Sequence, residues 1–277
     1  MKAAPAKAAN RLLGEYFRVR GRFSPEEEAR RALREITHRR GRCVAARDID
    51  RADEVLRHAC FDVDDVAENF LRVELRIESL ARFDSTAGAP VFGFARPQRW
   101  QITICERAER YMPLYRTTVM HELGHLLLHG NRNDSPSYSP RSPVRPAYEI
   151  EADEFMLRAI LPRSVLSLAM FRSAAWHDLS IVEAIRGANT ERGRWQYRQY
   201  YLPELVSQLC VSRELLCNTL TDLHLFTAET RQYHLSYAMP NRWKASTSGQ
   251  SLQPEVASMQ SAIERLRMTR LQAPQAS

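Results

Sequence analysis

Long apolar segments are absent from this sequence, and glycine is scarce. No stretch approaches the roughly 18 to 20 apolar residues that a membrane-spanning helix needs, so we expect a soluble protein. Only 10 glycines occur in 277 residues, and neither a GxxxxGKS/T nor a GxGxxG string is present, which argues against a glycine-rich nucleotide loop. The content of 44% hydrophobic and 26% charged residues instead indicates a folded chain of one or two domains.

Cysteine pairs of the CxxC type are also missing. The five cysteines form an odd set, which predicts unpaired thiols in a reducing compartment. The N-terminal sequence has neither the run of seven or more apolar residues nor the cleavage site of a secretory signal. We therefore expect a cytoplasmic protein with no membrane contact.

Positive charge is concentrated near the N-terminus. Residues 1–47 carry 13 Lys and Arg residues against 5 Glu and no Asp, whereas the formal charge of the whole chain is only +7. A basic arm on a nearly neutral body suggests an anionic partner such as nucleic acid or an acidic protein surface. An arginine-rich composition without any binding role is the alternative, because 37 of the 40 basic residues are Arg.

A capped helix is the clearest local signal in this part of the chain. In the segment SPEEEARRALREITHRRG, Ser24 has the position of an N-cap, Pro25 is the first helical residue and Glu27 completes a capping box. Gly41 marks the expected end of the helix. A second helix is predicted over residues 62–70.

Apolar alternation then predicts three short strands in front of a central helix. The expected strands are residues 72–78, 90–94 and 100–105. The central helix is predicted from Tyr115 to His129, with Gly130 ending it in a left-handed conformation. A further helix is expected from Tyr148 to Pro162. These elements favour an α+β fold that is predominantly helical, with a small sheet packed on the central helix.

The central helix contains His121-Glu122-Leu123-Gly124-His125, an HExxH motif. Two histidines at i and i+4 share one helical face about 6 Å apart, so both can bind one tetrahedral Zn²⁺ ion, with Glu122 within reach of its open position. A chance spacing on a solvated helix is the alternative. It is disfavoured because the neighbouring leucines indicate a buried helix, where unpaired His and Glu are costly.

Three carboxylates on the next predicted helix can supply the third ligand of a catalytic zinc ion. Glu149 and Asp153 share a face at i and i+4, whereas Glu151 points away. We expect Glu149 to be the ligand and Asp153 to accept the free N–H of His121. Glu151 is the alternative ligand, and favourable interaction with the helix dipole alone is the alternative explanation for these carboxylates.

The stretches YRTTVMHELGHLLLHG and YEIEADEFMLRAILP resemble the ImmA/IrrE family of zinc metallopeptidases, over roughly residues 55–226. The resemblance implies that His121, His125 and Glu149 bind one zinc ion per chain, with Mn²⁺ as a substitute, and that Glu122 is the general base. It implies a zincin-like fold. It also implies an intracellular endopeptidase that cleaves a transcriptional repressor, typically a helix-turn-helix protein.

The expected domain organisation combines this resemblance, which does not extend to the first or last 50 residues, with the composition of the chain. The predicted domains are residues 1–50, a basic arm and helix; 51–170, the zincin-like metallopeptidase domain; 171–230, a helix-turn-helix-like helical module; and 231–277, a polar tail with a weak amphipathic helix. Residues 1–47 are expected to be dispensable for the metal site.

Tyr138, Tyr148 and His177 are candidates for stabilising the oxyanion. The strand at 100–105 is a candidate for binding an extended peptide at its edge.

A different class of function stays open at this point. In residues 202–226 the turn is expected at Cys210, where such motifs usually have Gly, and Ser212 caps the second helix. Arg213 and Asn218 could face DNA, but Glu214 and Asp222 on the same helix oppose contact with phosphates. A packing or substrate-docking module is the other interpretation of this segment. The alternative function is a DNA-associated regulator, which contacts DNA through the N-terminal arm or residues 192–226 and has a structural or vestigial zinc site.

Overall fold

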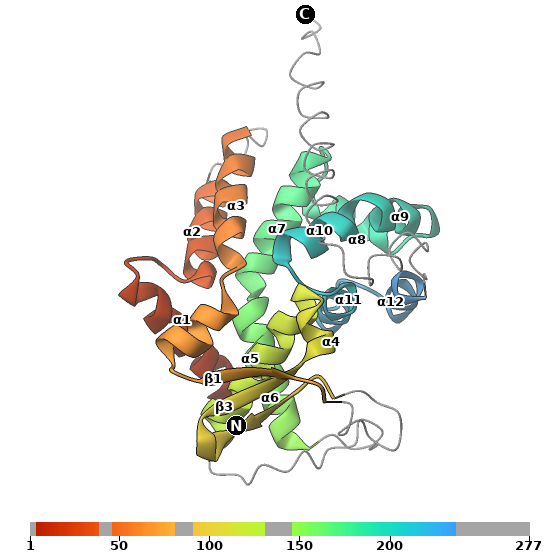
Figure 1. The fold of residues 1–277 in the computed structure, drawn as a ribbon. Helices are drawn as coiled ribbons and strands as arrows, with labels where there is room; N and C mark the ends of the chain where they lie inside the picture. Colours follow the sequence, from red (N-terminus) through yellow and green to blue (C-terminus); the bar gives the residue numbers. More distant parts are fainter. Residues whose placement is uncertain (1–3, 39–45, 81–90, 131–145, 237–277) are drawn as a thin grey trace, which may run out of the picture. The chain divides into compact units, whose positions relative to one another are not determined.

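One small sheet lies among many helices in the computed structural model, which describes residues 4–38, 46–80, 91–130 and 146–236 (Figure 1). All of these except Ser236 belong to the unit Met1–Leu235. The expected mostly helical α+β fold is confirmed. Gly41, Tyr138 and the predicted C-terminal amphipathic helix lie outside the described residues. None of the described helices has the length and apolar character that crossing a membrane requires.

The N-terminal part forms three helices, α1 (Ala4–Val19), α2 (Pro25–His38) and α3 (Ala46–Ala59). The predicted capping box of α2 is confirmed. The backbone N–H of Glu27 donates to Ser24 Oγ at 3.4 Å, and the backbone N–H of Ser24 donates to the Glu27 carboxylate at 3.1 Å. The helix predicted over residues 62–70 is a π-helical segment, η1 (Asp65–Phe70).

The sheet has the strand order β1-β3-β2. Its strands are β1 (Glu74–Glu78), β2 (Gly93–Arg96) and β3 (Gln101–Cys105), with a short 3-10 turn, η3 (Pro97–Arg99), between β2 and β3. β3 pairs in parallel with β1 and antiparallel with β2. Peptide binding at the edge of residues 100–105 is therefore wrong, because both edges of β3 are already paired within the sheet.

The central helix α5 (Met112–His129) follows the short helix α4 (Glu106–Glu109). It begins three residues before the predicted start, with a proline in its first turn, where the missing N–H is of no consequence. Gly130 has φ −52° and ψ −14°, so the predicted left-handed ending is wrong. After a gap in the described residues come α6 (Ala147–Ile160) and α7 (Arg163–Trp176).

The C-terminal part of the unit is a set of short helices. They are α8 (Ile181–Ala188), α9 (Glu191–Gln196), the π-helical η4 (Tyr197–Tyr201), α10 (Leu202–Leu209), α11 (Arg213–Asp222) and α12 (Ala228–Leu235). The predicted helix–turn–helix geometry at 202–226 is confirmed locally. Cys210 takes the left-handed conformation, with φ 48°, that glycine usually supplies, and Ser212 Oγ accepts the N–H of Leu215.

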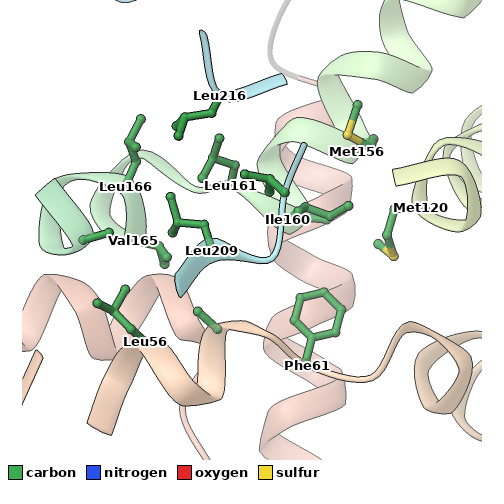
Figure 2. Close-up of a cluster of buried hydrophobic side chains, with 14 of the residues drawn as sticks. Leu56, Phe61, Met120, Met156, Ile160, Leu161, Val165, Leu166, Leu209 and Leu216 are labelled. Carbon is green, nitrogen blue, oxygen red and sulfur yellow. The ribbon is translucent and has the colours of Figure 1, made fainter. Parts of the chain in front are cut away.

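A large hydrophobic cluster connects most of these elements, and a small second cluster contains Leu80, Phe94 and Cys105. Figure 2 shows side chains from α3, α5, α6, α7, α10 and α11 converging on the large cluster, among them Leu56, Met120, Ile160, Leu166, Leu209 and Leu216. All six have 3% or less of their surface exposed. Helix α1 also contributes to this core and packs on α6 and α5.

The packing of α1 bears on the basic N-terminal segment. Leu12, Leu13, Tyr16 and Phe17 are each no more than 7% exposed, so one face of α1 is part of the core. Helix α2 packs on α7 and α3 in the same unit. Removing residues 1–47 would expose this core, which opposes the expectation that the segment is dispensable for the metal site.

Candidate metal centre

The HExxH residues lie on α5, where helical spacing turns two imidazole rings toward one point. His121 Nε2 and His125 Nε2 are 3.1 Å apart, and the ring centroids are 4.7 Å apart. Both side chains are largely buried, with 19% and 15% of their surface exposed. Two ring nitrogens that face each other this closely form a pair of donors directed at a common position.

Helix α6 adds a carboxylate to this pair. Glu149 Oε2 lies 3.3 Å from His121 Nε2, and Glu149 Oε1 lies 3.6 Å from His125 Nε2. One ligand atom from each of these three residues lies within 4.8 Å of the others. The structure thus brings together the three residues that the sequence suggested as metal ligands.

Asp153 lies one turn further along α6, at the outer side of His121. Its Oδ1 atom is 2.8 Å from His121 Nδ1. A carboxylate at this nitrogen fixes the ring with Nδ1 protonated and leaves the Nε2 lone pair free for a metal. This is the geometry expected for Asp153 from its spacing with Glu149.

A close approach of the two helices sets these distances. At Gly124 on α5, a Cβ atom would lie 3.1 Å from Ala152 Cα and 3.2 Å from Phe155 Cδ1 on α6. Such contacts are tighter than side chains normally make, so a residue with a Cβ would push the helices apart. The absence of a side chain at Gly124 therefore allows Glu149 to reach the two histidines.

The donor set fits a divalent transition metal. Two imidazole nitrogens and one carboxylate oxygen are the protein ligands typical of a catalytic zinc ion, which leaves a coordination position open. His129 lies one turn beyond His125, but its Nε2 faces Glu151 Oε2 at 3.5 Å. Glu151 therefore lies with His129 and not in the cluster of three donors, and Glu149 has the better geometry for a ligand.

The electrostatics of the cluster follow from burial and from its hydrogen bonds. Burial lowers the pKa of His121, but its hydrogen bonds to Asp153 and Glu149 outweigh this and raise the pKa to about 10. Burial raises the pKa of Glu149, yet the hydrogen bonds to His121 and His125 leave it well below the usual range. The cluster thus concentrates negative charge on Glu149 beside the two rings.

Glu122 lies in a different environment from Glu149. Its side chain is 6% exposed, and burial raises the pKa of its carboxyl, while the nearby His121 and His125 act in the opposite direction. The backbone N–H of Ala95 on β2 also donates a hydrogen bond to it. A buried carboxylate with a raised pKa beside a donor cluster has the properties of a general base.

Strand β2 closes this side of the site. A Cβ atom at Gly93 would lie 2.6 Å from Thr118 Cγ2 and 3.3 Å from Glu122 Cγ, so only glycine allows the strand to lie against α5 here. Sequence reasoning missed both Gly93 and Ala95. An isolated glycine inside a strand pattern signals a close backbone approach, and in PVFGF that signal was available.

Of the candidates for oxyanion stabilisation, Tyr148 lies beside the donor cluster and His177 lies elsewhere. Tyr148, at the start of α6, has its ring 5.8 Å from that of His125 and 6.1 Å from that of His129, so it borders the site. His177 instead packs on Tyr201 and faces Glu204 at 3.5 Å, among the helices after α6. Tyr148 is therefore the one candidate among the described residues that the structure places beside the donor cluster.

The helix-turn-helix-like segment uses some of its polar residues internally. Asn218 Oδ1 on α11 accepts a hydrogen bond from Arg231 Nε on α12 at 2.6 Å. Leu216 and Leu220 are fully buried, as their spacing predicts. Direct reading of DNA by this segment stays a prediction.

The fold and the cluster together define a class. A helical α+β protein in which an HExxH helix and the next long helix bring two histidines and a glutamate together has the arrangement of a metallopeptidase. The family model described as the IrrE N-terminal-like domain, a peptidase family, matches residues 91–221. The match covers slightly under half of the chain and supports its similarity to the ImmA/IrrE family. No curated protein and no solved structure matches the chain.

Proposed function

We propose that the protein is a zinc-dependent endopeptidase that cleaves an intracellular protein in the cytoplasm. The proposed substrate is a helix-turn-helix transcriptional repressor, whose cleavage derepresses genes. The family supports a peptidase. The observation that carries the proposal is the convergence of His121, His125 and Glu149 next to the buried Glu122.

His121, His125 and Glu149 would hold the zinc ion, and Mn²⁺ would serve as a substitute. When bound, such an ion supplies Lewis-acid chemistry, which polarises a peptide carbonyl and makes water more acidic. Asp153 orients His121 through its Nδ1 hydrogen bond, at 2.8 Å. The ring orientation of His121 is thereby set before any ligand binds.

Glu122 would act as the general base, which takes a proton from the attacking water. A general base works best when its pKa lies near the operating pH, because it must both accept and release a proton. Burial raises the pKa of Glu122 in that direction. The hydrogen bond from Ala95 N–H holds the carboxylate in place between β2 and the donor cluster.

Strand β2 offers a place for the substrate backbone. One of its edges pairs with β3, and no other strand among the described residues pairs with it. The N–H of Ala95 is directed at Glu122, so the free edge of β2 faces the donor cluster. An extended peptide added along this edge would pass beside Glu122.

The test compares Glu122→Gln with the matched control Glu151→Gln. Purified full-length proteins, loaded with zinc, are incubated with repressors encoded beside this gene, and fragments are followed on gels. Gln keeps the size and hydrogen bonding of Glu122 but cannot take up the proton, so we expect a loss of about 10²- to 10⁴-fold in rate with unchanged zinc content. The control variant should cleave like wild type.

Two results would count against the proposal. Full cleavage by the Glu122→Gln protein would show that this residue is not the base. If wild type cleaves none of the repressors but binds operator DNA in a salt-dependent manner, the DNA-associated regulator replaces the peptidase as the preferred function.

A further inference from the structure

Two cysteines that are 150 positions apart in the sequence meet outside the donor cluster. Cys60 directly follows α3, and Cys210 forms the left-handed turn between α10 and α11. Their thiol groups are close enough to interact electrostatically. Cys60 Sγ also lies 3.2 Å from the carbonyl oxygen of Gln208, on the last turn of α10.

A buried arginine holds the two backbone segments together. Arg116 on α5 is 3% exposed, and its guanidinium donates to the carbonyl oxygens of Cys210 at 3.0 Å, Leu209 at 3.3 Å and Ala59 at 3.5 Å. All three acceptors are neutral main-chain groups, so the positive charge stays available to the sulfur atoms beside it. One guanidinium thus spans the backbone next to Cys60 and that of Cys210.

This environment makes the two thiols unequal. The interaction with Cys60, together with the charge of Arg116, outweighs burial and lowers the pKa of Cys210 to about 6. The same interaction and burial raise the pKa of the Cys60 thiol well above its usual range. Cys210 is therefore the more acidic thiol of the pair, next to the charge of Arg116.

Cys60 opens on a surface pocket, and Cys210 is itself partly exposed. A pocket of about 570 Å³ lies between α1, the end of α3 and the start of η1, and Cys60 is one of its lining residues. Cys60 and Cys210 are both partly exposed, whereas Cys105 and Cys217 are buried. A reactive thiolate, a neighbouring second thiol and an access route are what oxidation-sensitive cysteine sites combine.

We propose that Cys60 and Cys210 form a redox-active dithiol that a hydroperoxide oxidises to a disulfide. In the first step the Cys210 thiolate attacks one peroxide oxygen, the O–O bond breaks, Cys210 becomes a sulfenic acid, and hydroxide or alkoxide leaves. In the second step Cys60 sulfur attacks Cys210 sulfur. The S–S bond forms, the S–O bond breaks, and the proton of Cys60 leaves with the hydroxyl group as water.

The experiment uses the full chain, freshly reduced and then treated with hydrogen peroxide at pH 7. Peptide mapping without reduction should find the peptides of Cys60 and Cys210 linked to each other. Because thiolate is the reacting form, Cys210 should react at least about 100-fold faster than the buried Cys217, whose pKa burial raises to about 11. Cys217 is thus an internal control on the same molecule.

The variant Cys60→Ser separates the two steps. Without the second sulfur, Cys210 should accumulate as a sulfenic acid that dimedone traps, and the introduced hydroxyl can still donate a hydrogen bond to the thiolate. The proposal is overturned if peroxide that oxidises free glutathione completely leaves the pair unlinked in wild type, or if Cys105 and Cys217 react as fast as Cys210. It is also overturned if dimedone finds no adduct on Cys210 in the variant.

Discussion

The close approach of α5 and α6 at Gly124 leads to a quantitative prediction for Gly124→Ala. An alanine Cβ would lie 3.1 Å from Ala152 Cα and 3.3 Å from Ala152 O, and both of these are backbone atoms that cannot rotate away. The helices must therefore separate by a few tenths of an ångström. Overpacking of this kind costs about 1 to 3 kcal/mol.

A second glycine provides the matched control. Gly14 lies inside α1, and a Cβ there meets no atom within 4 Å. Replacing a helical glycine by alanine stabilises a helix by about 1 kcal/mol in either case, because alanine restricts the unfolded chain. Gly14→Ala should therefore raise the free energy of unfolding by about 1 kcal/mol. The free energy of unfolding of Gly124→Ala should be lower than that of Gly14→Ala by about 1 to 3 kcal/mol.

The same displacement of the helices should weaken zinc binding. Because Glu149 is carried on α6, moving the helix draws its carboxylate away from His121 and His125, and we expect zinc affinity to weaken by about tenfold, or 1.4 kcal/mol. Urea unfolding of the metal-free proteins and competition titration with a zinc chelator measure the two effects. If Gly124→Ala gains as much stability as Gly14→Ala and binds zinc as tightly as wild type, the helices are not in the contact described.

Three further predictions concern the metal, the pH response and the N-terminal helix. His125→Ala should lose bound zinc while Glu151→Gln keeps it, and metal analysis that finds equal zinc in both would contradict the donor cluster. His234 is fully buried with no hydrogen-bond partner for either ring nitrogen among the described residues, and burial together with nearby arginines lowers its pKa to about 4. The unfolded chain takes up this proton near pH 6.5 and the folded chain does not, so stability should fall by about 2 kcal/mol from pH 7 to pH 5. His234→Phe, compared with wild type by urea unfolding at both pH values, should remove this loss, and an unchanged pH dependence would assign it to other groups. Deleting residues 1–20 should abolish cooperative thermal unfolding, because each large buried side chain of α1 contributes about 1.5 to 3 kcal/mol; a fragment that unfolds cooperatively and binds zinc would show that α1 is dispensable.

Local spacing was enough to predict the donors, because their geometry is helical. His121 and His125 are one turn apart, as are Glu149 and Asp153, and a regular helix fixes which side chains share a face. The sequence could therefore predict that Asp153 faces His121 and that Glu151 does not point at the same place. It also predicted the turn at Cys210, since two helical patterns meet there.

Contacts between distant segments could not be predicted in this way. The strand pattern does not reveal that β3 lies between β1 and β2, because strand order depends on packing and not on periodicity. The same holds for two contacts between distant segments. Gly93 and Ala95 lie next to Glu122, and Cys60 lies next to Cys210, but the local sequence around each residue does not indicate its distant partner. The basic charge of residues 1–47 suggests an arm outside the core, but one face of α1 is apolar and is part of the core.

The packing of α1 on α6 has a consequence for the order in which this protein folds. More than 120 residues separate Val19, at the end of α1, from Ala147, at the start of α6. Packing of the two helices therefore closes a long loop. Loops of this length close slowly, and α1 must wait for its partner while the chain is synthesised. The donors on α5 cannot meet Glu149 until α6 has left the ribosome, so metal loading has to follow translation of at least the first 160 residues.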